Sequence, residues 1–517
     1  MVKNCWPDSD ICGRNAEVVF QKAAPDNLCI IFDRKKEMEE ENRQVVLFPF
    51  MAQGHIIPFL ALALQIEKRH KYNITIVNTS QNIKKLRSSL PPNSSITLLQ
   101  IPFTPSHHGL PPNTENTDTI PYNLVIRLIQ ASTTLKPAFK NLVHNLIVQN
   151  KNQKLLVVAD IFFGWTAAVA KELGAFHVVF SGCSGYGLAC YYSLWLNLPH
   201  RRVDPTQELF TLPDFPEARD IHRTQLPNNI AEADGSDAWS LFQQQNLREW
   251  VNSDGVLFNT VHEFDSVGLG YFKRKLGRPV WAIGPILFTG SGSRGKGGGI
   301  DTKLCIEWLD SKPSKSVLFV CFGSMNTISA SQMMELAKAL ERSGKSFVWV
   351  VRPPIGFDIN SEFREEEWLP EGFVERVRES GKGLVVHDWA PQVEILSHPA
   401  VSVFLSHCGW NSVVESLSEG VPILGWPMAA EQFFNCKFLE EEVGVCVEVA
   451  RGKSWEVKCE DIAKKIELVM EETEKGITMR KKSGYVRDRI RVSMKDEDGF
   501  KGSSVRAMDD FLSSALS

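Results

Sequence analysis

A histidine and an aspartate occupy positions suited to acid–base chemistry. His55 ends the run Pro49-Phe-Met-Ala-Gln-Gly-His55, between a strand-like apolar stretch and an apolar helical pattern with Pro58 in its first turn, where proline is tolerated. Asp160 follows a second apolar run, Leu155-Leu-Val-Val-Ala159. A neutral imidazole can remove a proton from a hydroxyl, and a carboxylate beside it can orient the ring and stabilise its charged form. The pair predicts general base catalysis by His55 with Asp160 as its partner; the alternative role for Asp160 is a helix N-cap.

A second polar run, Ser406-His-Cys-Gly-Trp-Asn-Ser412, lies between an apolar strand-like stretch, Val401–Leu405, and a helical pattern through Glu415. Free backbone N–H groups and the positive end of the helix dipole gather at such a turn and attract phosphate groups. Gly409 lets the backbone approach a ligand closely, and His407 can donate a hydrogen bond to it. The run therefore predicts a diphosphate-binding site.

The residues around this second run resemble a known family. From Trp389 to Gln432, 44 residues read WAPQVEILSHPAVSVFLSHCGWNSVVESLSEGVPILGWPMAAEQ. In length, order and nearly every characteristic residue this stretch resembles the signature box of plant UDP-dependent glycosyltransferases. A looser resemblance runs from about Gln44 to the C-terminus. The resemblance implies an enzyme of secondary metabolism that transfers a sugar from a UDP-sugar to a small acceptor.

The same resemblance implies how the nucleotide is held. Trp389 would stack on the uracil, with the Ala390 backbone and Gln392 nearby, and Glu415 would accept hydrogen bonds from the ribose hydroxyls. The implied phosphate contacts are Ser324, His407, Asn411 and Ser412.

The resemblance also bears on the sugar. Glu431 and Gln432, which end the signature box, would hold the sugar hydroxyls. In the family, Gln at the last position commonly accompanies glucose and His accompanies galactose. Trp410 also fits a glucose donor, whereas Arg there would suggest glucuronate. We therefore expect UDP-glucose as the donor.

The implied reaction is a single in-line displacement at the anomeric carbon. The α-linked glucosyl group becomes a β-glucoside of the acceptor, and UDP leaves. The helix end, His407 and neighbouring amides would stabilise the diphosphate charge. No Asp-x-Asp pair stands where it could hold a divalent ion near the phosphates, so we expect neither a metal nor a cofactor.

The acceptor pocket is expected in the N-terminal domain. Candidate lining segments are Phe103–Leu110, Phe162–Trp165 and Ser181–Trp195, the last with Tyr186, Tyr191 and Tyr192. Aromatic and small side chains suit a flat lipophilic molecule that offers a hydroxyl or a carboxyl group, although such aromatics are as often ordinary core. The residues name neither the acceptor nor the group on it that reacts.

Short apolar strand-like runs alternate with helical patterns on both sides of a Gly/Ser-rich stretch. This alternation is typical of parallel sheets covered by helices on both faces. The expected strands are Gln44–Phe50, Asn73–Asn78, Ser95–Ile101, Lys154–Ala159, Gly255–Asn259, Ser316–Phe322, Ser346–Val351, Gly383–His387, Val401–Leu405 and Val421–Gly425. The fold class is α/β, and the resemblance implies the GT-B arrangement, with two facing Rossmann-like domains and an inter-domain cleft.

Five segments follow from these patterns. Residues 1–43 form a polar extension that we expect to be disordered, with Met38 as a possible second start. The N-terminal acceptor-binding domain spans 44–288, a flexible linker spans 289–300, and the C-terminal UDP-sugar-binding domain spans 301–490. By resemblance, residues 491–517 contain a helix that returns to the N-terminal domain.

Composition excludes several other classes of protein. The chain has 517 residues, 43% of them hydrophobic and 23% charged, with a net charge of −4, so nothing indicates a nucleic-acid surface. Eleven scattered cysteines lack metal-ligand spacing and are expected to be reduced thiols. The nearly uncharged stretch Leu173–Pro199 is broken by glycines and reads as strand–turn–helix rather than a membrane span. We expect a cytoplasmic monomer without a secretory signal.

Two alternatives fit parts of these patterns: a catalytically silent binding protein, and a different enzyme on the same architecture, such as a nicotinamide enzyme or a sugar-nucleotide epimerase. A catalytically silent UDP-sugar-binding protein would keep the signature box but would not need His55 and Asp160. A nicotinamide enzyme would carry Gly-x-Gly-x-x-Gly after the first strand, which Met51-Ala-Gln-Gly-His55 does not match. A sugar-nucleotide epimerase would act without any acceptor.

Overall fold

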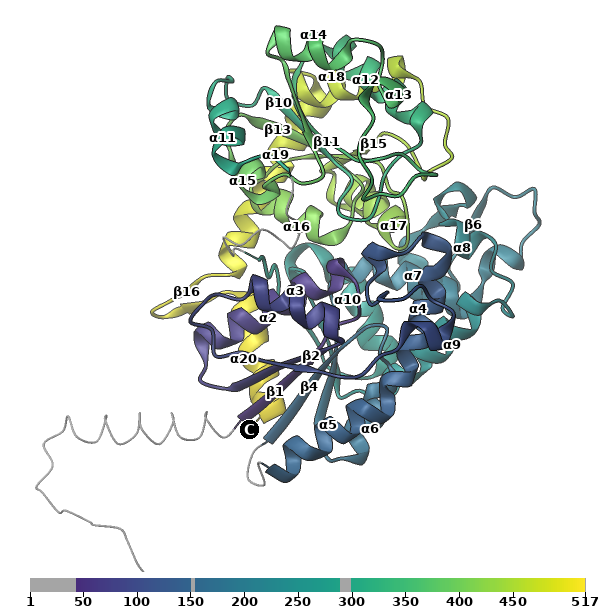
Figure 1. Cartoon of the computed structure of the whole chain (residues 1–517), viewed down its shortest axis with the longest axis vertical. Coiled ribbons are helices and arrows are strands. Elements are labelled where there is room, and N and C mark those ends of the chain that lie inside the picture. The colour runs from purple at the N-terminus through teal and green to yellow at the C-terminus, as the bar shows by residue number, and fades with distance from the viewer. Residues whose placement is uncertain (1–42, 150–153, 289–298, 517) are drawn as a thin grey trace, which may run out of the picture.

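The computed structural model of the chain describes residues 43–149, 154–288 and 299–516 and shows two α/β domains, one above the other (Figure 1). One domain is built on a seven-stranded sheet and the other on a six-stranded sheet. The expectations for the N-terminal extension, including Met38, and for nearly all of the 289–300 linker concern residues outside the described ranges.

The sheet of the N-terminal domain is parallel, in the order β3-β2-β1-β4-β5-β8-β9. Its strands are β1 (Arg43–Phe48), β2 (Asn73–Asn78), β3 (Thr97–Gln100), β4 (Lys154–Asp160), β5 (Phe176–Ser181), β8 (Gly255–Phe258) and β9 (Val280–Ala282). Val45 and Leu47 of β1 pack into one hydrophobic cluster, and Val46 and Phe48 pack into another. Both faces of the sheet are therefore buried, which explains the continuous apolar runs.

Helices cover both faces of this sheet. The helices of the N-terminal domain are α2 (Gln53–Arg69), α3 (Ser80–Ser89), α4 (Val125–Ser132), α5 (Lys136–Gln149), α6 (Trp165–Glu172), α7 (Gly185–Asn197), α8 (Asn228–Ala231), α9 (Ala238–Glu249) and α10 (His262–Leu276). The apolar side chains of α2 and α3 share a cluster with one face, and those of α4, α5 and α6 share a cluster with the other.

The sheet of the C-terminal domain is also parallel, in the order β12-β11-β10-β13-β14-β15. Its strands are β10 (Val317–Cys321), β11 (Ser346–Val351), β12 (Gly383–His387), β13 (Val401–Ser406), β14 (Ile423–Gly425) and β15 (Cys446–Glu448). Its helices are α11 (Thr302–Asp310), α12 (Ala330–Ser343), α13 (Glu365–Trp368), α14 (Phe373–Ser380), α15 (Gln392–Ser397), α16 (Trp410–Ser418), α17 (Gln432–Lys437), α18 (Cys459–Met470) and α19 (Glu474–Ser493).

The chain ends in a helix that lies against the N-terminal domain (Figure 1, yellow). This helix, α20 (Ser503–Leu516), buries Met508 and Phe511 in the cluster formed by β1, β2 and α2. Its Asp510 accepts a hydrogen bond of 2.7 Å from the indole N–H of Trp281 in β9. The last helix of the chain therefore packs in the same domain as the first described strand, β1.

The predicted α/β class with parallel sheets is confirmed, and most predicted strands differ from the observed ones by one or two residues at their ends. The stretch Leu173–Pro199 is strand, turn and helix, as predicted. Strands β9 and β15 went unnoticed because each is only three residues long and carries no periodicity of its own. The antiparallel pairs β6 (Leu209–Thr211) with β7 (Asp220–His222) and β16 (Asp496–Glu497) with β17 (Phe500–Lys501) were also not predicted.

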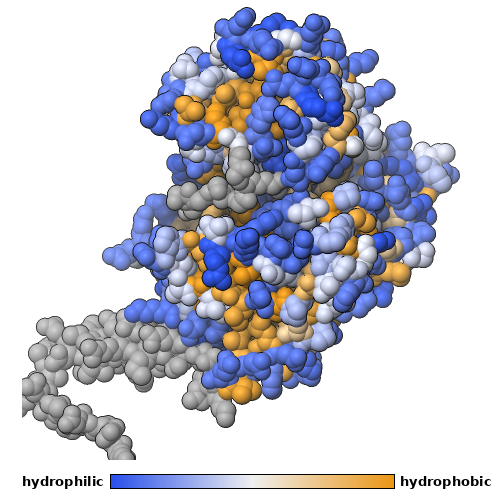
Figure 2. Space-filling view, viewed as in Figure 1, coloured by the Kyte–Doolittle hydropathy of each residue, from blue (hydrophilic) through white to orange (hydrophobic). Residues whose placement is uncertain are grey.

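The face of the molecule shown in Figure 2 is mostly polar, with apolar residues gathered in smaller groups on both domains. Within the described ranges, every helix is too short or too polar to cross a membrane.

Candidate active site

A cavity of about 350 Å³ lies between the domains, and we call it the cleft cavity. Its walls come from the carboxyl ends of strands in both sheets and from the helices that follow them, the usual place for ligands in open α/β sheets. All thirteen candidate site residues line it: His55, Asp160, Ser324, Trp389, Ala390, Gln392, His407, Trp410, Asn411, Ser412, Glu415, Glu431 and Gln432.

His55 and Asp160 are hydrogen-bonded to each other in this cavity. The Nδ1 atom of His55 lies 2.9 Å from Oδ2 and 3.1 Å from Oδ1 of Asp160. The two strands before them are neighbours, with Phe48 of β1 opposite Ala159 of β4, and this register brings the residues beyond their ends together. The bond to Nδ1 leaves Nε2 as the atom that can accept a substrate proton.

The burial of the pair differs between its two members. Asp160 is 1% exposed, whereas the side chain of His55 keeps 26% of its surface accessible. Burial lowers the pKa of His55, but the charge of Asp160 and its hydrogen bond outweigh burial, so the net pKa of His55 is raised. Asp160 is not the N-cap of α6, because Gly164 occupies that position; its Oδ1 accepts the Phe162 backbone N–H instead.

Glu431 faces the same histidine from the C-terminal domain. Burial raises the pKa of its carboxyl group, and His55 acts in the opposite direction through its charge. The carboxylate also contributes to the raised pKa of His55. The base is therefore influenced by acidic groups from both domains.

The phosphate-binding run forms the turn between β13 and α16. His407 is 8% exposed, its Nδ1 lacks a hydrogen-bond partner in the part of the chain that the structure describes, and burial lowers its pKa to about 4. The imidazole is therefore neutral near pH 7. A Cβ atom on Gly323 would lie 2.7 Å from the ring, and one on Gly409 would lie 2.4 Å from it. The His407 ring therefore fits between these two positions only because both residues are glycines.

Three residues implied for different parts of the nucleotide, the uracil, the phosphates and the ribose, are bonded to one another. The side-chain amide of Gln392 donates to the Ser412 hydroxyl at 2.9 Å and to the Glu415 carboxylate at 2.6 Å. Gln392 is the first residue of α15, whereas Ser412 and Glu415 lie in the first turns of α16. These contacts fix the orientation of a carboxylate that is 6% exposed.

Residues at the end of the signature box are oriented by the backbone. The Oε1 atom of Gln432 accepts the backbone N–H groups of Met428 and Ala429 at 3.0 and 2.9 Å. Its amide nitrogen is then the end that can donate to a ligand. Trp426, expected to pack, is fully buried, and its indole N–H donates to the Gly452 carbonyl.

Two donor-site residues also join the domains. The indole N–H of Trp410 donates to the Asn259 carbonyl at 2.9 Å, and this side chain is only 2% exposed. The amide of Asn411 donates to the Gly54 carbonyl at 3.0 Å, next to His55. The strand-to-helix turn that was predicted to bind phosphate therefore also touches the loop that carries the base, which the sequence did not indicate.

The acceptor side is apolar and only partly matches the predicted segments. Phe162 and Tyr191 line the cleft cavity. Tyr186 and Tyr192 instead belong to the core and donate to the carbonyls of Ala218 and Leu247. Phe103–Leu110 lies away from the lining, with Phe103 stacked on His108.

Several lining residues were missed by the sequence analysis. They share no motif and come from separate elements of the N-terminal domain: Phe50, Ile57, Thr117, Tyr122, Val125, Ile129, Asn229 and Trp239. Only Phe50 lies in a stretch singled out for chemistry. The apolar ones could not be found because an apolar residue in a helix has the same pattern whether it faces a ligand or the core, and Thr117 and Asn229 belong to no motif that indicates a ligand.

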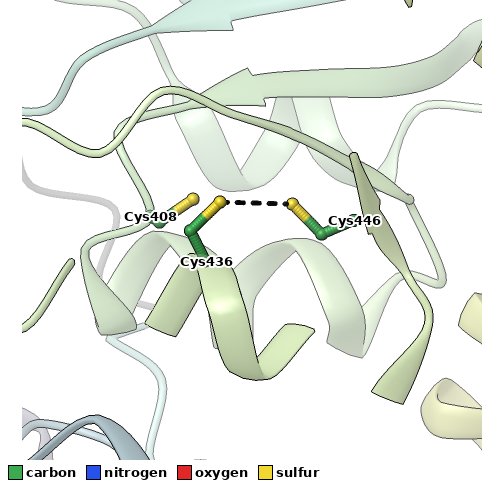
Figure 3. A group of neighbouring side chains, drawn as sticks. All are labelled: Cys408, Cys436 and Cys446. Carbon is green, nitrogen blue, oxygen red and sulfur yellow. Dashed lines mark hydrogen bonds between the residues drawn. The ribbon is translucent and has the colours of Figure 1, made fainter. Parts of the chain in front are cut away.

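Three cysteines meet behind the donor loop (Figure 3). The sulfur atoms of Cys408, Cys436 and Cys446 lie within 4.8 Å of one another, with 3.8 Å between the last two. All three are fully buried, and burial raises the pKa of the Cys446 thiol well above its ordinary range. The pKa values of Cys408 and Cys436 are also raised: hydrogen bonds within the trio shift each of them in both directions, and burial raises both. These neutral thiols pack around Gly425, where a Cβ would lie 2.4 Å from the Cys436 sulfur.

Comparison with known proteins agrees with this geometry. A family described as UDP-glucoronosyl and UDP-glucosyl transferase matches residues 301–488, and one described as glycosyltransferase, N-terminal domain, matches residues 41–287. UDP-glycosyltransferase 92A1 of Arabidopsis thaliana is 52% identical over 487 residues, which cover 93% of this chain and 98% of the relative. Crocetin glucosyltransferase 3 of Crocus sativus is 44% identical over 451 residues, which cover 84% of this chain and 91% of the relative.

A solved structure shows the same architecture. The structure of UGT73P12 of Glycyrrhiza uralensis, complexed with glycyrrhetinic acid 3-O-monoglucuronide, has a TM-score of 0.77 and 30% identity. The match covers 92% of this chain and 95% of that chain. The predicted GT-B arrangement of two facing Rossmann-like domains is confirmed.

Proposed function

This chain belongs to the family of plant UDP-glycosyltransferases, enzymes that act on small metabolites, and we propose that it moves glucose from UDP-glucose to a small lipophilic acceptor. The reacting group on the acceptor is a hydroxyl or carboxyl group. The products are a β-glucoside, formed with inversion at the anomeric carbon, and UDP. The observation that carries the proposal is the hydrogen-bonded pair His55–Asp160 inside a cavity whose other wall is the signature box.

The geometry of that pair supports a role for His55 in removing the proton of the acceptor. Neutral His55 accepts the hydroxyl proton at Nε2 as the acceptor oxygen attacks the anomeric carbon. The imidazolium that forms is stabilised by Asp160 at 2.9 Å, as in a catalytic triad. An acceptor carboxyl group is already ionised near neutral pH and would need the base less.

The leaving-group side is served by the C-terminal domain. The bond between the anomeric carbon and the β-phosphate oxygen breaks as the new bond forms, so negative charge develops on UDP. The backbone N–H groups at the start of α16 and the neutral ring of His407 are placed to donate to the diphosphate. We call the part of the cleft cavity that the C-terminal domain lines the donor wall, and the part that the N-terminal domain lines the acceptor wall. Because the donor wall supplies these groups itself, we propose that the reaction needs no metal ion.

Support for glucose comes from Gln432, whose amide is held by two backbone N–H groups, and from the glucosyltransferase named among the relatives. The apolar walls formed by Phe50, Phe162, Tyr191 and Trp239 support a lipophilic acceptor. We also propose that the enzyme works as a monomer in the cytoplasm.

The test is a mass-spectrometric screen of purified protein with a chelator and a panel of phenolic, terpenoid and carboxylic acceptors. UDP-glucose, UDP-galactose and UDP-glucuronate are offered separately. We expect hexose conjugates with UDP-glucose, and a proton coupling constant at the anomeric position typical of a β-linkage. UDP binding without a conjugate from any acceptor would contradict the proposal and favour a silent UDP-sugar-binding protein.

A further inference from the structure

Arg352 lines the cleft cavity from the C-terminal domain, although it lies outside the signature box. It directly follows β11, which lies between β10 and β12 in the sheet. The residue is 6% exposed and lines the cleft cavity. A buried arginine at the carboxyl end of an interior parallel strand is placed where these sheets bind ligands.

The guanidinium ties together the two loops that flank it. Its Nη1 donates to the Ser324 carbonyl at 2.6 Å and its Nη2 donates to the Asp388 carbonyl at 2.7 Å. Each loop contains a left-handed residue, with φ of 77° at Gly323 and 60° at Asp388. One loop leads to Ser324 and the other to Trp389, so the fork of Arg352 sets the distance between a candidate phosphate contact and a candidate uracil contact.

The charge of this guanidinium is not balanced by an adjacent anion. Among the described residues, no carboxylate lies within the 4.0 Å that defines an ion pair with Arg352; the two bonded groups are neutral carbonyls. Asp388 interacts with Arg352 through its charge, but its side chain is exposed. The nearby thiol of Cys321 is neutral because burial raises its pKa.

The third nitrogen of the Arg352 guanidinium is also unpaired. Its Nε is buried and has no hydrogen-bond partner in the part of the chain that the structure describes. Burial lowers the pKa of the group, yet a guanidinium keeps its proton. An unpaired buried cation is unfavourable unless a ligand supplies the compensating charge.

We propose that Arg352 is a donor-specificity residue whose positive charge selects the charged nucleotide over an uncharged nucleoside, while its fork holds the two donor loops. The inference rests on the proposed function, because it takes the diphosphate of a UDP-sugar as the anion. In the low-dielectric cleft, the charge of Arg352 attracts the diphosphate even without direct contact. The groups of the signature box supply the directional hydrogen bonds.

The experiment compares UDP with uridine, because the two share the base and the ribose and differ in charge. Dissociation constants are measured by calorimetry for the wild type, Arg352→Gln and Arg352→Lys. Arg364→Gln is the matched control, since it removes a cation of the same domain whose exposed side chain is paired with Glu367. Circular dichroism and melting temperature check the fold of each variant.

We expect Arg352→Gln to lower the preference for UDP over uridine about tenfold or more, the scale of one charge–charge interaction inside a protein. Arg352→Lys loses the fork and binds both ligands more weakly, but it keeps the charge and therefore most of the preference. The KM for UDP-glucose should rise in both variants, and Arg364→Gln should match the wild type.

Three results would decide the matter against the proposal. Equal losses of UDP and uridine binding in Arg352→Gln would show that Arg352 only orders the loops. If Arg352→Gln does not fold, a collapse of the preference in Arg352→Lys would overturn the role of charge. A wild type that binds neither UDP nor uridine would refute the proposed function itself, which is a distinct outcome.

Discussion

The donor wall and the acceptor wall of the cleft cavity are built in different ways. On the donor wall, polar side chains are fixed by hydrogen bonds to backbone groups or to each other, as with Gln432, Gln392 and Arg352. On the acceptor wall, apolar side chains such as Phe162 and Trp239 are held by packing. Directional bonds specify one ligand geometry, whereas packed apolar surfaces accept many shapes. We therefore expect donor choice to be the stricter of the two, and acceptor choice to depend on a few side-chain volumes.

The largest effect is expected at the residue that serves both walls. His55→Ala removes the base, and we expect kcat to fall by about 10²–10⁴-fold for every hydroxyl acceptor. The affinity for UDP should stay within about twofold of the wild type, because the donor wall is intact. Product formation by mass spectrometry and UDP binding by calorimetry measure the two quantities.

His107→Ala is the matched control for this variant, since His107 is exposed and lies away from the cavity lining. The kcat of His107→Ala should equal that of the wild type. Near-normal turnover in His55→Ala would remove His55 from the mechanism and leave the two walls without a shared catalytic group.

The next largest effect tests the rigidity of the donor wall. In Gly323→Ala, the new Cβ would lie 2.7 Å from the His407 ring, and φ of 77° is strained for any residue with a side chain. Left-handed strain alone costs about 1–2 kcal/mol, so we expect the KM for UDP-glucose to rise about tenfold or more. Steady-state kinetics with two unrelated acceptors should show the same factor for both. A factor that depends on the acceptor would contradict the separation of the walls.

Gly484→Ala provides the control for adding a methyl group, because a Cβ built there has no heavy atom of the described residues within 4 Å apart from its chain neighbours and the backbone of its own helix. This glycine is in the middle of α19, where alanine favours the helix. The KM for UDP-glucose should not change.

A smaller effect is expected on the acceptor wall. Trp239 lines the cavity and stacks on Trp195, with ring centroids 6.4 Å apart. Trp239→Leu should shift the ratio of kcat/KM between a flat phenolic acceptor and a bulky terpenoid acceptor by several-fold, about the value of one or two methylene contacts. The dissociation constant of UDP should not move. A change in UDP affinity equal to the change in acceptor ratio would show that the walls are coupled.

The same contrast explains what the sequence could predict. The parallel sheets could be predicted because strands buried on both faces, such as β1 and β10, appear in the sequence as unbroken apolar runs. The turn that carries His407 was predicted because a strand and a helix flank it within one contiguous stretch, and the other candidate donor residues were implied by the resemblance of the signature box. The acceptor wall was only partly predicted, since Tyr122, Ile129 and Trp239 come from three elements and meet only through packing. The contact of Asn411 with Gly54 depends on how the domains face each other, and no local pattern encodes it.

The smallest expected effect is a shift in a pH profile. His55 acts as a base only when neutral, and its pKa is raised above 6.5 because Asp160 outweighs the effect of burial. For the wild type, kcat/KM with a neutral acceptor should therefore rise with pH through an apparent pKa above 6.5. Asp160→Asn removes the carboxylate and leaves the effect of burial, so the acid limb should move to lower pH even as kcat falls. Trp239→Leu should leave the limb in place, because its side chain touches the acceptor and not the base. An acid limb that moves in Trp239→Leu but not in Asp160→Asn would assign the titration to the acceptor wall and not to the catalytic pair.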